Sequence, residues 1–138
     1  MGSLGNTVLV IDDDEDITTL VHEILSDEGY AVIILQDERV ESIQEAVDRL
    51  EPNCILLDGG TGAGYGTSWE TAALMASRSP AIPVIMFTAY TWATAEAAEN
   101  ASARSQAAGF AGQLSKPFEI DELISLVNLA VRKSESAA

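Results

Sequence analysis

The distribution of apolar residues along the chain predicts alternating strands and helices. Residues 7–11 form a continuous β-branched and apolar run that ends abruptly in acidic residues, a pattern typical of a strand buried on both faces of a parallel sheet. A stretch with helical spacing follows and stops at Gly29, which indicates an amphipathic helix ended by glycine. The apolar positions of this helix are Ile17, Leu20, Val21, Ile24 and Leu25.

The same alternation continues to the C-terminal end of the sequence. Further strands are predicted at 31–35, 54–57, 84–87 and 112–115, and further helices at 40–50, 68–77, 93–108 and 120–131. The segment 93–108 is rich in alanine and has little apolar stripe, so its helix depends on intrinsic propensity. Five successive β–α units predict a parallel sheet with right-handed crossovers and helices on both faces.

The size and composition of the chain indicate one domain. With 138 residues, 47% of them hydrophobic and 21% charged, the sequence supports a single core. We expect this domain to span residues 7–133, with 1–6 as an N-terminal tail and 134–138 as a C-terminal tail or the start of a linker. No apolar run approaches the roughly 18 residues of a membrane helix, and the N-terminus lacks a signal pattern. We therefore expect a cytoplasmic protein that does not contact membranes.

The charge of the chain is strongly negative and unevenly placed. Seven Lys and Arg residues against 22 Asp and Glu residues give a net charge of −15. Residues 1–58 hold 15 of the acids and only two of the bases. Such a field disfavours direct binding of nucleic acid. The single cysteine, Cys54, excludes an internal disulfide and a multi-cysteine metal site.

Chemically active side chains collect where the predicted strands end. Ligands of a doubly wound sheet bind at the carboxyl ends of its strands. The residues at those ends are Asp12, Asp13, Asp58, Thr88 and Lys116. Crowded carboxylates repel one another unless a divalent cation neutralises them, and hard oxygen ligands favour Mg²⁺. One carboxylate can then act as a nucleophile towards a phosphoryl group, while a lysine and a hydroxyl contact the transferred oxygens. The next acids, 14–16, are assigned to a helix N-terminus, where the helix dipole favours negative charge.

Four motifs, each at a predicted strand end, resemble one known family. They are Val8-Leu-Val-Ile-Asp-Asp-Asp14, Ile55-Leu-Leu-Asp58, Phe87-Thr-Ala89 and Lys116-Pro-Phe118. With these motifs in this order, the chain resembles the receiver domain of bacterial two-component response regulators over residues 7–133. The resemblance implies an α/β fold of flavodoxin-like (βα)5 topology, a three-layer sandwich with a five-stranded parallel sheet in the order 2-1-3-4-5.

The resemblance also implies a role for each strand-end residue. Asp58 would be the phosphoacceptor. Mg²⁺ (or Mn²⁺) would be bound directly by Asp13 and Asp58, by the backbone carbonyl of Gly60, and through water by Asp12. Thr88 would move towards the phosphoryl group and Lys116 would contact it, and the peptide bond between Lys116 and Pro117 would be cis.

The function that the resemblance implies is signalling rather than enzymatic turnover. A histidine kinase or phosphotransfer protein would supply the phosphoryl group, and an unknown downstream protein or output domain would read the result. Members of the family often pair through their fourth and fifth helices, which leaves a homodimer open for this chain.

Two departures from the family pattern support a second hypothesis. The loop after the phosphoacceptor reads Gly59-Gly-Thr-Gly-Ala-Gly-Tyr-Gly66, and Gln113 occupies the usual aromatic position of the fifth strand. The stretch from Thr88 to Lys116 is also several residues longer than is usual for the family. The alternative is therefore an atypical receiver with a vestigial site, which acts as a protein-binding scaffold without a phosphorylation switch. A small phosphatase that uses Asp58 as its nucleophile is disfavoured, because the sequence contains no segment for a substrate-binding cap.

Overall fold

The computed structural model describes residues 6–37, 39–58, 65–78, 81–88, 111–115 and 118–137, apart from the side chains of 65–69, 88, 115 and 133–137. In chain order, the elements are β1 (Thr7–Ile11), α1 (Glu15–Asp27), β2 (Ala31–Leu35), α2 (Val40–Leu50), β3 (Cys54–Asp58), α3 (Tyr65–Ala76), β4 (Val84–Thr88), β5 (Gly112–Ser115) and α6 (Ile120–Ala137). All five predicted strands are confirmed. The predicted helix at 93–108 and the peptide bond between Lys116 and Pro117 lie outside the described residues.

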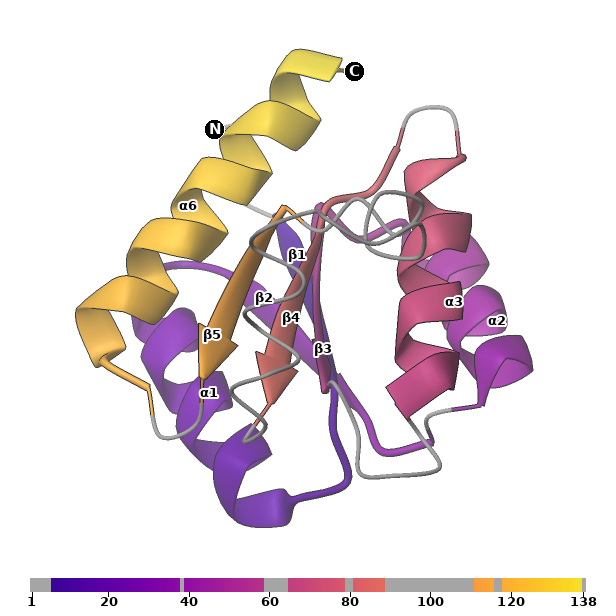
Figure 1. Cartoon of the computed structure of the whole chain (residues 1–138). Coiled ribbons are helices and arrows are strands. Elements are labelled where there is room, and N and C mark those ends of the chain that lie inside the picture. The colour runs from indigo at the N-terminus through magenta and orange to yellow at the C-terminus, as the bar shows by residue number, and fades with distance from the viewer. Residues whose placement is uncertain are drawn as a thin grey trace.

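The five strands form one parallel sheet in the order β2-β1-β3-β4-β5, which confirms the predicted flavodoxin-like topology. Helices α1 and α6 cover one face of the sheet, and α2 and α3 cover the other (Figure 1). Successive side chains of a strand point to opposite faces. Leu9 and Ile55 accordingly join the core under α2 and α3, and Val8 and Leu56 join the core under α1 and α6. Apolar runs without alternation therefore fill two cores at once.

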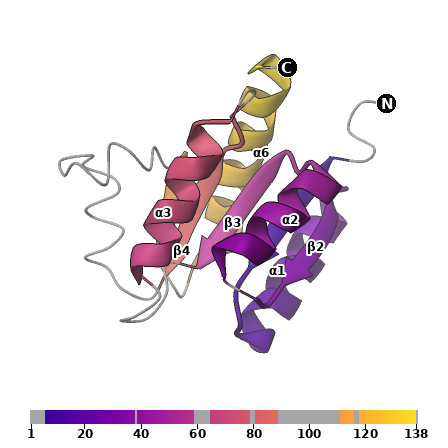
Figure 2. The ribbon, with the colours of Figure 1, turned by 90° about the vertical axis from the view of Figure 1, so that its right-hand side faces the viewer.

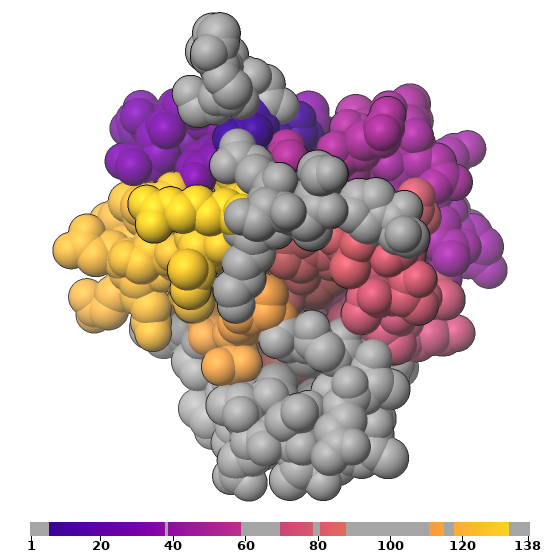
Figure 3. All heavy atoms as spheres, turned by 90° about the horizontal axis from the view of Figure 1, so that it is seen from above, coloured from indigo at the N-terminus to yellow at the C-terminus, as the bar shows by residue number. Residues whose placement is uncertain are grey.

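The three layers are visible from two further directions. Figure 2 shows α2 and α3 in front of the sheet, with α6 behind it. Figure 3 looks down on the amino ends of the strands, with α6 in yellow and orange on one side and α2 and α3 in magenta and pink on the other. Among the described helices, none is long and apolar enough to cross a membrane.

Helix α1 turns most of its predicted apolar stripe to the core, since Val21 and Leu25 are buried and Ile17 and Ile24 pack against them, but one residue departs from the prediction. Leu20, a member of the predicted apolar stripe, is 42% exposed. Thr18 is buried instead, together with Val21 and Leu25. The Thr18 hydroxyl donates a hydrogen bond to the carbonyl of Glu15 at 3.2 Å. The buried hydroxyl therefore has a hydrogen-bond partner within its own helix.

The start of one helix and the end of another also differ from the prediction. Helix α3 begins at Tyr65 rather than near Ser68. Helix α6 runs to Ala137, beyond residue 131 where the apolar pattern predicts its end. The apolar pattern ends at Val131, but the Arg, Lys, Glu and Ala residues beyond it have high helix propensity.

The end of α1 follows the prediction closely. Gly29 has a φ of +95°, a conformation that costs glycine little because it lacks a Cβ. The backbone N–H of Gly29 donates to the carbonyl of Ser26, and that of Tyr30 donates to the carbonyl of Leu25. This is the Schellman arrangement that closes a helix, and it returns the chain towards β2.

Candidate functional site

The carboxyl ends of β1 and β3 bring three carboxylates together. Ile11 pairs with Leu57 across these neighbouring strands, so Asp12 and Asp58 follow at adjacent positions of the same sheet end. One carboxylate oxygen each from Asp12, Asp13 and Asp58 lies within 4.8 Å of the others. The predicted convergence of these three residues is therefore present in the structure.

Burial strengthens the electrostatic repulsion among the carboxylates of this cluster. Asp12 is 1% exposed and Asp58 is 9% exposed, whereas Asp13 is exposed to solvent. Negative charges so close together repel one another, and two of them have little contact with water. A divalent cation held by these carboxylates would relieve this repulsion. Three carboxylate oxygens are a hard donor set that fits Mg²⁺ or Mn²⁺, with further coordination positions left to water or substrate.

The chain around the cluster is held by a relay of hydrogen bonds. The backbone N–H of Asp14 donates to Asp12 Oδ1 at 3.0 Å. Asp14 is the N-cap of α1, and its Oδ1 accepts from the backbone N–H groups of Asp16 at 3.0 Å and Ile17 at 3.3 Å. Such capping satisfies donors that a helix leaves unpaired. The assignment of residues 14–16 to a helix start is confirmed, and the relay fixes Asp12 relative to α1.

The other predicted site residues are only partly covered by the description. Thr88 is the last residue of β4 and pairs with Ser115 of β5, but its side chain is not described. Gly60 and Lys116 lie outside the described residues. Gln113 lies in β5, opposite Met86 of β4. The roles of Thr88, Gly60 and Lys116 stay predictions.

An aromatic pair beside the site was not identified from the sequence. The rings of Phe87 and Phe118 lie edge to face, with centroids 5.1 Å apart and an interplanar angle of 71°. Phe87 pairs in register with Asp58 and precedes Thr88 in the chain. A contact between residues 31 positions apart leaves no periodic signal, so the sequence motif that contains Phe118 did not predict it.

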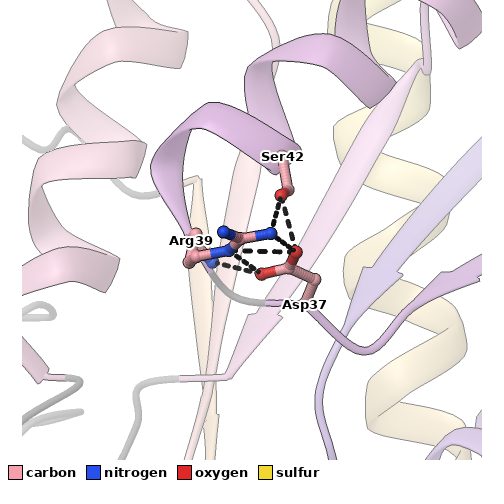
Figure 4. Close-up of polar contacts among 3 residues, drawn as sticks. All are labelled: Asp37, Arg39 and Ser42. Carbon is pink, nitrogen blue, oxygen red and sulfur yellow. Dashed lines mark hydrogen bonds and ion pairs between the residues drawn. The ribbon is translucent and has the colours of Figure 1, made fainter.

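A second unpredicted feature is a polar network in the segment that joins β2 to α2 (Figure 4). The Asp37 carboxylate accepts hydrogen bonds from the backbone N–H of Arg39 at 3.1 Å, from the Arg39 guanidinium at 2.7 Å and from the Ser42 hydroxyl at 2.6 Å. The guanidinium and the hydroxyl hold the pKa of Asp37 well below its usual range. The carboxylate in turn raises the pKa of Arg39. The Arg39 side chain is solvent-exposed and ion-paired with Asp37.

The single histidine and the single cysteine lie in opposite environments. His22 is exposed on α1. Cys54 is fully buried at the start of β3, and burial raises the pKa of its thiol to about 12. A thiol in this environment stays protonated and unreactive at neutral pH, so Cys54 is a packing residue.

Comparison with known proteins points to one family. A family model of the response regulator receiver domain matches residues 8–128. The nitrogen assimilation regulatory protein NtrX of Azorhizobium caulinodans is 29% identical over 128 residues, which cover 93% of this chain and 26% of that protein. The chain therefore spans about a quarter of the length of this relative.

Solved structures agree with that match. NtrX from Brucella abortus superposes with a TM-score of 0.73 at 25% identity, covering 94% of this chain and 26% of its own. The chemotaxis response regulator CheY4 of Vibrio cholerae superposes with a TM-score of 0.69 at 25% identity, covering 90% of this chain and 97% of its own.

Proposed function

Because the chain belongs to the response regulator receiver domain family, we propose that it accepts a phosphoryl group on Asp58 from the phosphohistidine of a histidine kinase or phosphotransfer protein. The observation that carries this proposal is the cluster of Asp12, Asp13 and Asp58, with carboxylate oxygens within 4.8 Å of one another. The ends of two neighbouring parallel strands supply the cluster, at the edge of the sheet where doubly wound folds bind their ligands.

The chemistry is a displacement at phosphorus. A carboxylate oxygen of Asp58 forms a bond to phosphorus while the bond between phosphorus and the donor imidazole nitrogen breaks, and the released imidazole takes a proton from solvent. Asp13 and Asp58 would hold Mg²⁺ directly, with Asp12 acting through water and Gly60 through its carbonyl. When bound, the ion neutralises charge on the carboxylates and on the incoming phosphoryl group.

Two further residues would act on the transferred group. Lys116 would place an ammonium beside the phosphoryl oxygens, and the Thr88 hydroxyl would donate a hydrogen bond to one of them. The new dianionic group draws both side chains inwards and shifts the domain between two surface states. Hydrolysis of the acyl phosphate resets the domain, which is a phosphoacceptor rather than a turnover enzyme.

The proposed partners follow from this chemistry. The phosphodonor protein docks at the carboxyl end of the sheet, and a downstream protein, an output domain or a second copy of the chain reads the altered surface. Direct binding of nucleic acid is disfavoured by the net charge of −15. The proposal includes a cytoplasmic location, where kinases draw their phosphoryl group from ATP.

Labelling with a small phosphodonor tests the proposal. Wild-type protein incubated with acetyl phosphate and Mg²⁺ should gain the mass of one phosphoryl group in intact-protein mass spectrometry. Asp58→Asn should abolish the gain. Asp14→Asn is the matched control, because asparagine caps a helix as well as aspartate does, and it should label normally. An unlabelled wild-type protein, or a labelled Asp58→Asn variant, contradicts the proposal.

The scaffold alternative is favoured by Gln113 in β5, where the family usually has an aromatic residue, and by the glycine-rich sequence 59–66. Titration with beryllofluoride, which mimics a bound phosphoryl group, separates the two functions. In a switch, backbone chemical shifts should change well beyond the pocket. In a scaffold they should change only near Asp58 or not at all.

A further inference from the structure

Two threonines are buried in the described helices, and their hydroxyl groups are in different situations. Thr18 of α1 donates a hydrogen bond to the carbonyl of Glu15. Thr71 of α3 is fully buried, and its Oγ1 is the one buried side-chain polar atom without a hydrogen-bond partner among the described residues. Burying a hydroxyl without a partner is unfavourable, because the group loses its hydrogen bonds to water. Helix α3 therefore carries a cost that α1 avoids.

Packing competes with a hydrogen bond at Thr71. Its neighbours in α3, Ala72 and Met75, are fully buried in the core under α2 and α3. A threonine hydroxyl in a helix can reach the carbonyl three or four positions earlier, as that of Thr18 does. For Thr71 these carbonyls belong to positions 67 and 68, and its hydroxyl bonds to neither of them. The described position of α3 thus has the core contacts and lacks the hydrogen bond.

The two ends of α3 are fastened unequally. At the C-terminal end, the backbone N–H of Ile82 donates to the carbonyl of Met75 at 3.2 Å, and the Arg78 guanidinium donates to Asp48 of α2 at 2.9 Å. Helices α2 and α3 lie side by side on this face of the sheet (Figure 2). The first turn contains Gly66 and no acidic residue, so it has neither high helix propensity nor a charge that favours the helix dipole. A bend of α3 would therefore move its N-terminal half about its C-terminal end.

We infer that α3 is a conformational element with two positions, in which a small bend of its N-terminal half lets the Thr71 hydroxyl donate to a backbone carbonyl of the preceding turn. Hydrogen bonds of this kind bend helices. The bent position gains the hydrogen bond at the expense of the core contacts of Ala72 and Met75. Because each position lacks what the other has, the bent helix is a minor state of the folded protein.

The place of α3 in the chain gives this bend a consequence for the surface of the domain. Helix α3 is the next described element after β3, which ends at Asp58. Its bend provides a second surface state on the α2–α3 side of the sheet. This property does not depend on phosphoryl transfer to Asp58.

Thermal melting and NMR relaxation of the full chain test the inference. Thr71→Val keeps the shape of the side chain and removes the hydroxyl, so it should raise the melting temperature by roughly 3–5 °C. Thr18→Val is the matched control in α1, where an existing hydrogen bond is lost, and it should not raise the melting temperature. In relaxation dispersion, the wild-type backbone amides of residues 70–76 should show exchange on the microsecond-to-millisecond timescale. Thr71→Val should abolish this exchange and Thr18→Val should retain it.

A second variant at the same position separates the hydroxyl from its packing. Thr71→Ser keeps the hydroxyl and loses the methyl group, so it should retain the exchange even where it lowers the melting temperature. The inference is overturned if Thr71→Val melts at or below the wild-type temperature, because the hydroxyl then has a partner such as a buried water molecule. It is also overturned if residues 70–76 show no exchange in wild type, if the exchange survives in Thr71→Val, or if it is lost in Thr71→Ser.

Discussion

Strands β2 and β3 have the same length and similar apolar content, yet the fold treats them differently. All five residues of β3 are buried. In β2, Ala31 is exposed and Ile33 is 37% exposed. Strand β3 lies between β1 and β4, whereas β2 is an edge strand that pairs only with β1. Burial is thus set by position in the strand order, and the proposed phosphoacceptor stands at the end of the better shielded strand.

The largest expected difference between the two strands is in their contribution to stability. Leu56→Ala in β3 empties a site in a closed core and should lower the free energy of unfolding by about 3 kcal/mol. Ile33→Ala in β2 removes a side chain that is already partly in water, and should cost below about 1 kcal/mol. Urea denaturation of both variants measures the difference. Equal losses would show that the edge strand is as well packed as the central one.

A smaller change in the free energy of unfolding is expected at alkaline pH, and it comes from Cys54 of β3. The pKa of Cys54 is raised from 9.0 to about 12 in the folded protein. Because the unfolded chain releases this proton first, stability is full below pH 9 and falls as pH rises towards 12. At 1.36 kcal/mol per pH unit, the loss at pH 10.5 is about 2 kcal/mol. Comparing wild type with Cys54→Ala between neutral pH and pH 10.5 isolates this effect, and parallel curves would contradict it.

The smallest change in the free energy of unfolding is expected at acid pH, and it comes from Asp37 in the segment after β2. The folded pKa of Asp37 is lowered from 3.8 by hydrogen bonds from Arg39 and Ser42. Its contribution is therefore present above pH 3.8 and is lost as pH falls below that value. The Asp37 side chain is 34% exposed, so solvent screening keeps the effect small. In urea titrations, the stability advantage of wild type over Asp37→Asn should shrink below pH 3.8. An advantage independent of pH would contradict the assignment.

Much of the fold could be predicted from the sequence because its signals are local. Continuous apolar runs mark β1 to β4, and Gly29 marks the end of α1. The carboxylates of the site could be predicted for the same reason. Asp12 and Asp13 come just after β1 and Asp58 ends β3, and parallel strands place their ends at one edge of the sheet.

The features that could not be predicted depend on contacts distant in sequence. Periodicity assigned Leu20 to the core, but the rotation of α1 is decided by packing on the sheet, which accepts Thr18 instead. Nothing in the composition of β2 marks it as the edge strand. The Phe87–Phe118 contact likewise exists only once β4 lies beside the segment that leads into α6.

The three consecutive aspartates after β1 show that the same exchange, aspartate to asparagine, has different consequences at neighbouring positions. Position 14 caps a helix, a role that asparagine fills equally well. Position 13 supplies an exposed carboxylate to the cluster, and position 12 a buried one that also accepts a backbone hydrogen bond. Exchange of aspartate for asparagine should therefore have little effect at position 14, whereas at positions 13 and 12 it removes a negative charge from the carboxylate cluster. A substitution matrix that rates the exchange as mild is correct for only one residue in three.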